Sequence, residues 1–342
     1  MKDHEFFMQK CISLAKKGFP NSSPNPMVGA ILVHHNKIIG EGYHKKYGSK
    51  HAEVEVIDSV KNKQVLTQAT LYVNLEPCAH FGKTPPCADL IIKHKIPKVV
   101  IGCQDSYSKV SGKGIRKMKE AGIEVVSGIL EEKCKRLNKR FFTYHEKQRP
   151  YIILKWAQSK DGFIAPLSQN KPFWMTSIES KQLVHKWRSE EDAILIGRIT
   201  AQKDNPLLTV REVKGSNPTR IVIDRKLILS KNLNLFNNAS NTIIFNELRS
   251  VKEETNEYLK IDFKKLLSNS LRELHRKGIQ SIIIEGGCKI LDSFIKSNIW
   301  DEARIFTADQ KIQHGIEAPI ISGKILSESQ INLDFLKIII ND

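Results

Sequence analysis

The chain has 342 residues, of which 40% are hydrophobic and 27% are charged. This composition excludes a largely disordered or fibrous protein, and the length exceeds what one ordinary core fills, so we expect two domains. The 54 lysines and arginines outnumber the 37 aspartates and glutamates, which gives a formal net charge of +17. Such a charge attracts polyanions such as RNA or small phosphorylated molecules, and by itself it does not choose between them.

The N-terminus and the cysteines bear on where the protein works. The opening MKDHEFFMQK carries charges where a signal peptide has an apolar run, and no later segment has the apolar stretch of a membrane span. Six cysteines without the dense, even spacing of a secreted scaffold indicate free thiols or metal ligands instead of disulfides. We therefore expect a cytoplasmic protein with no membrane partner.

The first half predicts a helix, a hairpin and then alternating helices and strands. Apolar residues recur at helical spacing over 4–17, and a loop over 20–26 follows. Two β-rich segments, 28–34 and 37–43, are separated by a short polar turn. We then expect helices from Ala52, about Cys87 and Gly114, and strands at 70–75, 99–103 and 124–126. This order is typical of an α/β fold with helices packed on a sheet.

The segment between 131 and 149 is heavily charged and ends at Pro150, where a new strand over 151–157 begins. We place the domain boundary there, between a domain of residues 1–147 and one of residues 150–342. The second half is also α/β, and no internal repeat relates the two halves. Its expected strands are 193–196, 220–224, 242–245, 280–284 and 302–307, and its expected helices are 178–189, 263–276 and 288–297.

Three residues in the first half have the types and spacing of zinc ligands. His51 and Glu53 open a predicted helix, and Cys78 is separated by eight residues from Cys87, which opens the next. A catalytic zinc site takes three nitrogen or sulfur ligands and leaves the fourth position to water. The H-x-E and P-C pattern is the signature of zinc-dependent base deaminases, in which the glutamate moves protons. We predict one zinc ion on His51, Cys78 and Cys87, with Glu53 as the catalytic residue.

Two alternatives stay open for this pattern. A structural zinc would have four protein ligands and would be needed for folding, and His44 and His80 are possible fourth ligands. An RNA-editing or nucleoside deaminase would use the positive charge to bind nucleic acid, although aromatic residues for base stacking make up only 7% of the chain. The other four cysteines are interpreted as core or surface thiols, namely Cys11, Cys103, Cys134 and Cys288.

The second half has weaker local signals. No G-x-G-x-x-G follows a strand, so a Rossmann dinucleotide site is not expected. Glu285-Gly286-Gly287 lies where a strand passes through glycines into a helix, and backbone N–H groups at such a place can bind phosphate. A simple tight turn explains the same residues equally well.

These motifs together resemble a known family. The segments 24–29 (PNPMVG), 42–44 (GYH), 51–53 (HAE) and 76–87 (EPCAHFGKTPPC) closely resemble the deaminase half of the bifunctional riboflavin-biosynthesis deaminase/reductases. The segments 157–162, 174–176, 197–200, 204–211 and 284–287, with Arg188, are similar to the reductase half. The resemblance implies a cytidine-deaminase-like three-layer α/β/α domain followed by a dihydrofolate-reductase-like α/β domain.

The resemblance also implies two consecutive reactions of riboflavin biosynthesis. A zinc-dependent hydrolase step would deaminate 2,5-diamino-6-(5-phosphoribosylamino)pyrimidin-4(3H)-one to 5-amino-6-(5-phosphoribosylamino)uracil. An oxidoreductase step would then use NADPH to reduce the ribosyl chain, giving 5-amino-6-(5-phosphoribitylamino)uracil. The expected partner is thus a small phosphorylated pyrimidine and not a nucleic acid, and we expect the enzyme to be a homo-oligomer.

Residue roles follow from the resemblance position by position. Asn25 would contact the pyrimidine in the first domain. In the second domain the substrate residues would be Pro172, Arg188, Leu208, Arg211 and Glu285, of which the two arginines can clamp a phosphate through forked hydrogen bonds. The NADPH residues would be Ala157, Trp174, Thr200, Asp204, Gly287, Cys288, Lys289, Ile290, Leu291, Asp292 and Ser293. The chain departs from the family at Pro172, where a serine is frequent, and at 105–108, where a DPNP-like run is usual.

Overall fold

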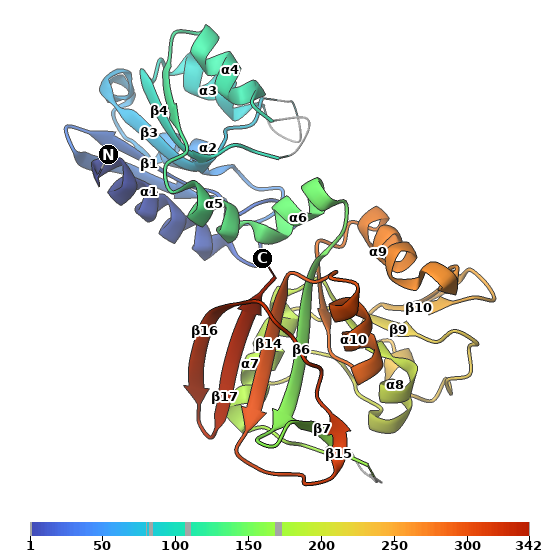
Figure 1. Cartoon of the computed structure of the whole chain (residues 1–342). Coiled ribbons are helices and arrows are strands. Elements are labelled where there is room, and N and C mark those ends of the chain that lie inside the picture. The colour runs from blue at the N-terminus through green and yellow to red at the C-terminus, as the bar shows by residue number, and fades with distance from the viewer. Residues whose placement is uncertain (1, 80, 82–84, 107–110, 168–172, 342) are drawn as a thin grey trace. The chain divides into compact units, whose positions relative to one another are not determined.

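The computed structural model describes residues 2–79, 81, 85–106, 111–167 and 173–341. The chain divides into two compact units, residues 1–148 and 149–342 (Figure 1). Each unit has its own sheet and its own hydrophobic clusters. The predicted α/β fold class is confirmed in both.

The first unit is built on a five-stranded sheet in the order β2-β1-β3-β4-β5. β1 pairs antiparallel with β2 and β3, while β3, β4 and β5 run parallel. The strands are β1 (Gly29–His34), β2 (Lys37–Tyr43), β3 (Thr70–Leu75), β4 (Lys98–Cys103) and β5 (Glu124–Ser127). The helices are α1 (Lys2–Ala15), α2 (Ala52–Ser59), α3 (Cys87–Lys93), α4 (Lys113–Glu120), α5 (Glu131–Leu137) and α6 (Lys139–Lys147), with short 3-10 turns η1 (Lys16–Gly18) and η2 (Lys63–Gln68).

Helices cover both faces of this sheet because successive strand residues point to opposite sides. On β1, Ala30 and Leu32 join one buried cluster with residues of α2, α3 and α4. Ile31 and Val33 join another with residues of α1, α5 and α6. Three layers result, as the resemblance implied.

The second unit has a ten-stranded sheet in the order β11-β12-β10-β9-β8-β13-β6-β14-β17-β16, and β7 (Phe163–Pro166) pairs with β15 (Gly315–Glu317) in a separate small sheet. The strands of the large sheet are β6 (Tyr151–Ser159), β8 (Ala193–Gly197), β9 (Thr219–Ile223), β10 (Thr242–Asn246), β11 (Val251–Glu253), β12 (Asn256–Lys260), β13 (Ser281–Ile284), β14 (Glu302–Ala308), β16 (Lys324–Ile331) and β17 (Asp334–Ile340). The helices are α7 (Ile178–Glu190), α8 (Arg198–Asp204), α9 (Leu266–Arg276) and α10 (Cys288–Lys296), with 3-10 turns η3 (Asn234–Phe236) and η4 (Phe263–Lys265).

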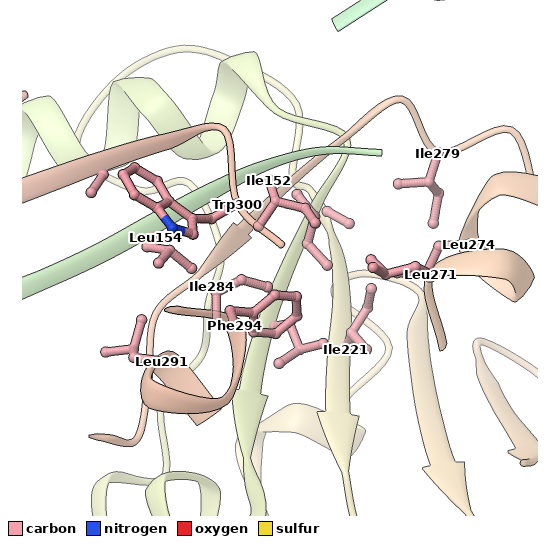
Figure 2. Close-up of a cluster of buried hydrophobic side chains, with 14 of the residues drawn as sticks. Ile152, Leu154, Ile221, Leu271, Leu274, Ile279, Ile284, Leu291, Phe294 and Trp300 are labelled. Carbon is pink, nitrogen blue, oxygen red and sulfur yellow. The ribbon is translucent and has the colours of Figure 1, made fainter. Parts of the chain in front are cut away.

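Buried clusters lie on the two faces of the large sheet. On one face, leucines of α9 and Phe294 of α10 pack on Ile152, Ile221 and Ile284 of the central strands (Figure 2). On the other, residues of α7 and α8 pack with Ile153, whose side chain points away from that of Ile152. The central parallel strands are therefore covered on both sides.

The predicted elements lie within a few residues of their expected bounds, and several others are present that were not predicted. The charged stretch before Pro150, for which no element was predicted, forms α5 and α6, and the C-terminal tail forms the hairpin of β16 and β17. β7, β11, β12, β15 and α8 were not predicted either. Across the described residues, no helix combines the length and the apolar character that crossing a membrane requires.

Candidate active sites

The three predicted zinc ligands meet where β3 ends and two helices begin. His51 precedes α2, Cys87 is the first residue of α3, and Cys78 follows β3. His51 Nδ1 lies 3.3 Å from Cys87 Sγ and 3.7 Å from Cys78 Sγ, and the three ligand atoms all lie within 4.8 Å of one another. A tetrahedral zinc ion separates a nitrogen and a sulfur ligand by about 3.6 Å, so this donor set fits zinc.

The two thiols differ in their readiness to lose a proton. The hydrogen bond with Cys87 is the largest of the influences that lower the pKa of Cys78, and the backbone N–H of Cys87 also donates to Cys78 Sγ over 3.3 Å. The same hydrogen bond and burial raise the pKa of Cys87. Metals bind the thiolate form of cysteine. In this arrangement Cys78 therefore loses its proton, and becomes able to bind a metal, more readily than Cys87 does.

Glu53 lies beside the ligands without being one of them. It is in the first turn of α2 and only 3% exposed. Burial raises the pKa of Glu53 to about 7, although the neighbouring His51 acts in the opposite direction. A buried carboxyl group next to three metal ligands can hold a proton and pass it to a reacting atom.

The possible fourth ligands distinguish a catalytic site from a structural one. His44 Nε2 lies 3.2 Å from Asn25 Nδ2, and His44 Nδ1 lies 3.0 Å from the carbonyl oxygen of Lys50. Both ring nitrogens of His44 thus have partners, and the ligand cluster found among the described residues has three members. His80 lies outside the described residues. The geometry favours the three-ligand, catalytic arrangement.

Two buried asparagines, which the sequence did not single out, hold the segment that carries Asn25. Asn138 Oδ1 accepts a hydrogen bond of 2.7 Å from the N–H of Met27, and Nδ2 of Asn138 and of Asn74 both donate to the Met27 carbonyl oxygen. Asn74 Oδ1 also accepts from the N–H of Gly29. This segment is therefore fixed to β3 and to the start of α6.

In the second unit, Thr200 and the turn that begins at Gly287 lie together where neighbouring parallel strands end. β8, β13 and β6 are adjacent; α8 begins directly after β8, and α10 begins after residues 285–287, which follow β13. The N–H of Gly197 donates to the Gly286 carbonyl oxygen over 2.9 Å, and Thr200 Oγ1 lies 3.1 Å from where a Cβ on Gly287 would be. The first-turn N–H groups of α10 and this hydroxyl can hold a phosphate of a dinucleotide.

The other predicted cofactor residues have varied surroundings. Ala157 is half-buried near the end of β6, and Asp204 ends α8, where burial raises the pKa of its carboxyl group. Trp174 is 67% exposed and stacks under the ammonium group of Lys181 of α7 at 5.3 Å.

The turn from Gly287 to Ser293 forms the start of α10, and several of its side chains are engaged within the protein. Leu291 is buried in the core, and Ile290 packs against Gly197. Cys288 Sγ contacts Asp292 at 3.7 Å, and Ser293 donates to the carbonyl oxygen of Lys289. A ligand at this turn would thus be held mainly by backbone groups.

The predicted substrate residues are centred on a buried ion pair. Arg188 Nη2 of α7 lies 2.8 Å from Glu285 Oε2, and the Arg188 Nη1 also donates to the Thr209 carbonyl oxygen at 3.5 Å. Arg211 Nη1 donates to Thr209 Oγ1 over 2.8 Å, so both guanidinium groups meet at one residue. Leu208 is buried in the core with a φ of 53°. Pro172 lies outside the described residues.

Two titratable residues that the sequence analysis missed belong to this group. Lys155 of β6 lies beside Glu285, because the parallel register pairs Leu154 with Ile284 one position earlier. Burial lowers the pKa of Lys155, while the Glu285 carboxylate raises it. His185 Nδ1 accepts a 2.9 Å hydrogen bond from the N–H of Arg211. The sequence offers one signal for Lys155, because it is a lysine inside the apolar strand YIILKWA. It offers no signal for His185.

Comparisons with known proteins match each unit separately. Residues 1–103 match the cytidine and deoxycytidylate deaminase zinc-binding region, and residues 150–312 match the RibD C-terminal domain. The riboflavin biosynthesis protein RibD of Aquifex aeolicus is 40% identical over 329 residues, which cover 94% of this chain and 92% of that protein. The RibD protein of Bacillus amyloliquefaciens is 36% identical and covers 94% and 88%.

Solved structures give the same result over both units. A diaminohydroxyphosphoribosylaminopyrimidine deaminase/5-amino-6-(5-phosphoribosylamino)uracil reductase from Thermotoga maritima superimposes with a TM-score of 0.89 at 36% identity, covering 100% of this chain and 99% of that one. RibD of Acinetobacter baumannii has a TM-score of 0.89 at 31% identity, with the same coverage.

Proposed function

Since this chain belongs to the RibD family of bifunctional riboflavin-biosynthesis deaminase/reductases, we propose which of its residues carry each reaction and that each unit houses one of them. The substrates are small phosphorylated pyrimidines, and the enzyme uses zinc and NADPH. Water replaces the 2-amino group of 2,5-diamino-6-(5-phosphoribosylamino)pyrimidin-4(3H)-one, which leaves as ammonia. The resulting uracil derivative is then reduced at the ribosyl chain to 5-amino-6-(5-phosphoribitylamino)uracil.

In the first unit His51, Cys78 and Cys87 would hold the zinc ion. When bound there, zinc supplies a Lewis acid that lowers the pKa of water to near neutrality. Glu53 takes the proton that the attacking water loses and delivers it to the departing amine. Its place in the first turn of α2, buried beside the ligands, keeps bulk water from exchanging that proton.

Asn25 orients the pyrimidine in this proposal. If His44 Nδ1 donates to the Lys50 carbonyl oxygen, His44 Nε2 is left to accept from the Asn25 amide. The Asn25 carbonyl oxygen then accepts a hydrogen bond from a ring N–H of the substrate. Asn74 and Asn138 hold the Asn25 segment in place through Met27.

In the second unit the start of α10, with Thr200, binds NADPH, and Trp174, Asp204 and Ala157 contribute further contacts. NADPH supplies the hydride, which goes to C1 of the opened ribose. The protein's task is to align the two reactants and to stabilise charge. Arg188 and Arg211 bind the substrate phosphate, and Glu285 accepts hydrogen bonds from the pyrimidine. Lys155 places a cation beside Glu285, where it can donate to a ribose oxygen.

One observation carries the proposal: three zinc-type ligand atoms lie within 4.8 Å of one another, with a buried glutamate beside them. The test is to give the wild-type enzyme the diaminopyrimidine substrate first without and then with NADPH. We expect ammonia and the deaminated intermediate to form in the first case, and one NADPH to be oxidised per ammonia in the second. No ammonia release, or NADPH oxidation without prior deamination, would contradict the proposed order.

We also propose that the enzyme is a cytoplasmic homo-oligomer. None of the six cysteines, all of which the structure describes, forms a disulfide, as is usual in a reducing compartment. β16 lies at one end of the ten-stranded sheet, and a terminal strand offers unpaired backbone groups to a second copy. Sedimentation of the purified enzyme and cell fractionation test the two points; a monomer, or enzyme in a membrane or secreted fraction, would contradict them.

A further inference from the structure

Glu76 is buried at the end of β3, two residues before the zinc ligand Cys78. Its two carboxylate oxygens accept hydrogen bonds from four backbone N–H groups, one just after β4 and three at the start of α4. Oε2 accepts from Gly112 at 2.9 Å and from Asp105 at 3.2 Å, and Oε1 accepts from Gly114 at 2.9 Å and from Ile115 at 3.2 Å. Only 3% of the residue is exposed. A carboxylate has the four acceptor positions that this arrangement needs.

Of these donors, Asp105 follows β4, and Gly112, Gly114 and Ile115 lie at the start of α4. The start of α4 packs against the residue between Glu76 and Cys78: a Cβ on Gly114 would lie 2.1 Å from the Pro77 carbonyl oxygen, so only glycine fits there. The N–H of Glu76 also donates to the Cys103 carbonyl oxygen over 3.0 Å. The backbone that leads to Cys78 is thus fixed from the side of β4 and α4.

The other side of Cys78 is fixed by α3. The N–H of Ala88 donates to the Cys78 carbonyl oxygen over 3.1 Å, and the N–H of Cys87 donates to Cys78 Sγ. Since α3 fixes Cys78 through its carbonyl oxygen and its Sγ, the position of Cys78 Sγ relative to the other two ligands also depends on the backbone just before Cys78. That backbone is the part that Glu76 fixes.

We propose that Glu76 is a positioning residue of the zinc centre, which sets the place of Cys78 by binding the N–H of Asp105 after β4 and three N–H groups at the start of α4. The inference rests on the proposed zinc site. Glutamine has the same shape but only one acceptor oxygen, and its NH₂ group would face two backbone N–H donors. The E76Q variant therefore loses two hydrogen bonds and places its NH₂ group against two N–H donors, which moves the start of α4 and Cys78 with it.

The test measures zinc affinity by competition with a coloured chelator. Residues that support metal ligands typically contribute about 10- to 100-fold to metal affinity, and we expect E76Q to bind zinc more weakly by that factor. The matched control is E124Q: Glu124 of β5 is also a glutamate of the first unit, but it is exposed and pairs with Lys98 at the surface. E124Q should bind zinc as the wild type does. Reductase activity on the deaminated intermediate should be unchanged in both variants.

A second variant keeps the inference testable if E76Q does not fold. G114A keeps the Glu76 carboxylate but pushes on the Pro77 carbonyl oxygen from the start of α4, and it should weaken zinc binding in the same direction. Circular dichroism of the zinc-free proteins shows whether each variant is folded, and affinity is compared only for folded ones; if E76Q is unfolded, G114A decides. Wild-type zinc affinity in a folded E76Q or, failing that, in G114A overturns the inference. An absence of deamination in the wild type would instead overturn the proposed function, because zinc affinity is measured without substrate.

Discussion

Arg188 and Glu285 form an ion pair inside the second unit, with 2.8 Å between Nη2 and Oε2 and side chains that are only 11% and 9% exposed. Arg188 comes from α7, whereas Glu285 follows β13 in the middle of the sheet. A buried pair of this kind is costly to break, because the remaining charge has no partner and no water. If the pair binds substrate as proposed, substrate binding and the stability of this unit depend on the same two side chains.

Removing the charge of Glu285 should destabilise the second unit. E285Q leaves Arg188 and Lys155 buried without their anion, at a cost of about 2–5 kcal/mol in unfolding free energy. All four tryptophans, Trp156, Trp174, Trp187 and Trp300, lie in residues 149–342, so urea unfolding followed by tryptophan fluorescence reports on this unit. Unfolding at the wild-type urea concentration would contradict the assigned role of the pair.

E285Q should also change how the stability of the second unit depends on pH in the acidic range. Burial raises the pKa of Glu285, but the charges of Arg188 and Lys155 outweigh it and bring the pKa down to about 2 from 4.5. A carboxyl group with a depressed folded-state pKa contributes stability above the unfolded pKa and loses it as pH falls from about 4.5 to about 2. Wild-type stability should fall over that range, and E285Q should show a smaller fall. Equal slopes would contradict the ion pair's contribution.

His185 should cause a separate loss of stability of the second unit at less acidic pH. Burial, helped by Arg188 and Arg211, lowers its pKa from 6.5 to about 4. The unfolded chain binds the proton more readily, so stability is full above about pH 6.5 and falls as the pH drops toward 4. H185N keeps an acceptor for the Arg211 N–H and removes the titration. Its stability should vary less than that of the wild type between these two values, as read from tryptophan fluorescence; an identical dependence would contradict this assignment.

Zinc removal should separate the two activities. C87S, or chelation of the wild type, removes a ligand or the ion without touching the second unit. Ammonia release should stop, while NADPH oxidation on the deaminated intermediate should continue at the wild-type rate. The first unit has two buried clusters of its own, so its circular dichroism should persist after chelation. Unfolding on chelation would indicate a structural zinc instead.

Replacing Arg220 should affect only the stability of the second unit. Its guanidinium group is fully buried and donates to Thr242, Asn237 and the carbonyl oxygens of 234, 237 and 240. R220M leaves these acceptors unpaired and should cost about 3–5 kcal/mol. In the control R225M, an exposed arginine paired with Glu247 is changed, which should cost less than about 1 kcal/mol. Equal losses in the two variants would contradict the role given to Arg220.

The sequence predicted the strands best where a buried sheet makes apolar runs unavoidable, as in β3, β4 and β13. Prediction from the sequence failed where the local composition of a segment does not indicate how buried the segment is in the fold. No helix was predicted in the heavily charged stretch that forms α5 and α6, yet Cys134, Phe141 and Phe142 on them are buried. β17 was missed because what makes it a strand is antiparallel pairing with β14, a contact between distant segments that local periodicity does not reveal.

In the candidate sites too, features set by local sequence could be predicted and features set by contacts between distant segments could not. The cluster of His51, Cys78 and Cys87 could be predicted because three zinc-type ligands and a glutamate have a characteristic spacing around two helix starts. Lys155 reaches Glu285 through the register of two parallel strands, and His185 reaches Arg211 across a helix and a loop. Such relationships depend on tertiary geometry. The sequence named Glu76 only as part of a motif, and its four N–H partners appear only in the fold.

The most direct test of the account is the E53Q variant, because Glu53 is assigned a proton-transfer role and is not a zinc ligand. The variant should bind zinc and should oxidise NADPH on the deaminated intermediate at the wild-type rate. Its ammonia release from the diaminopyrimidine substrate should fall by about 10²- to 10⁴-fold, the usual contribution of a general acid–base residue. Ammonia release by E53Q at the wild-type rate would contradict the assignment of the first unit as the deaminase.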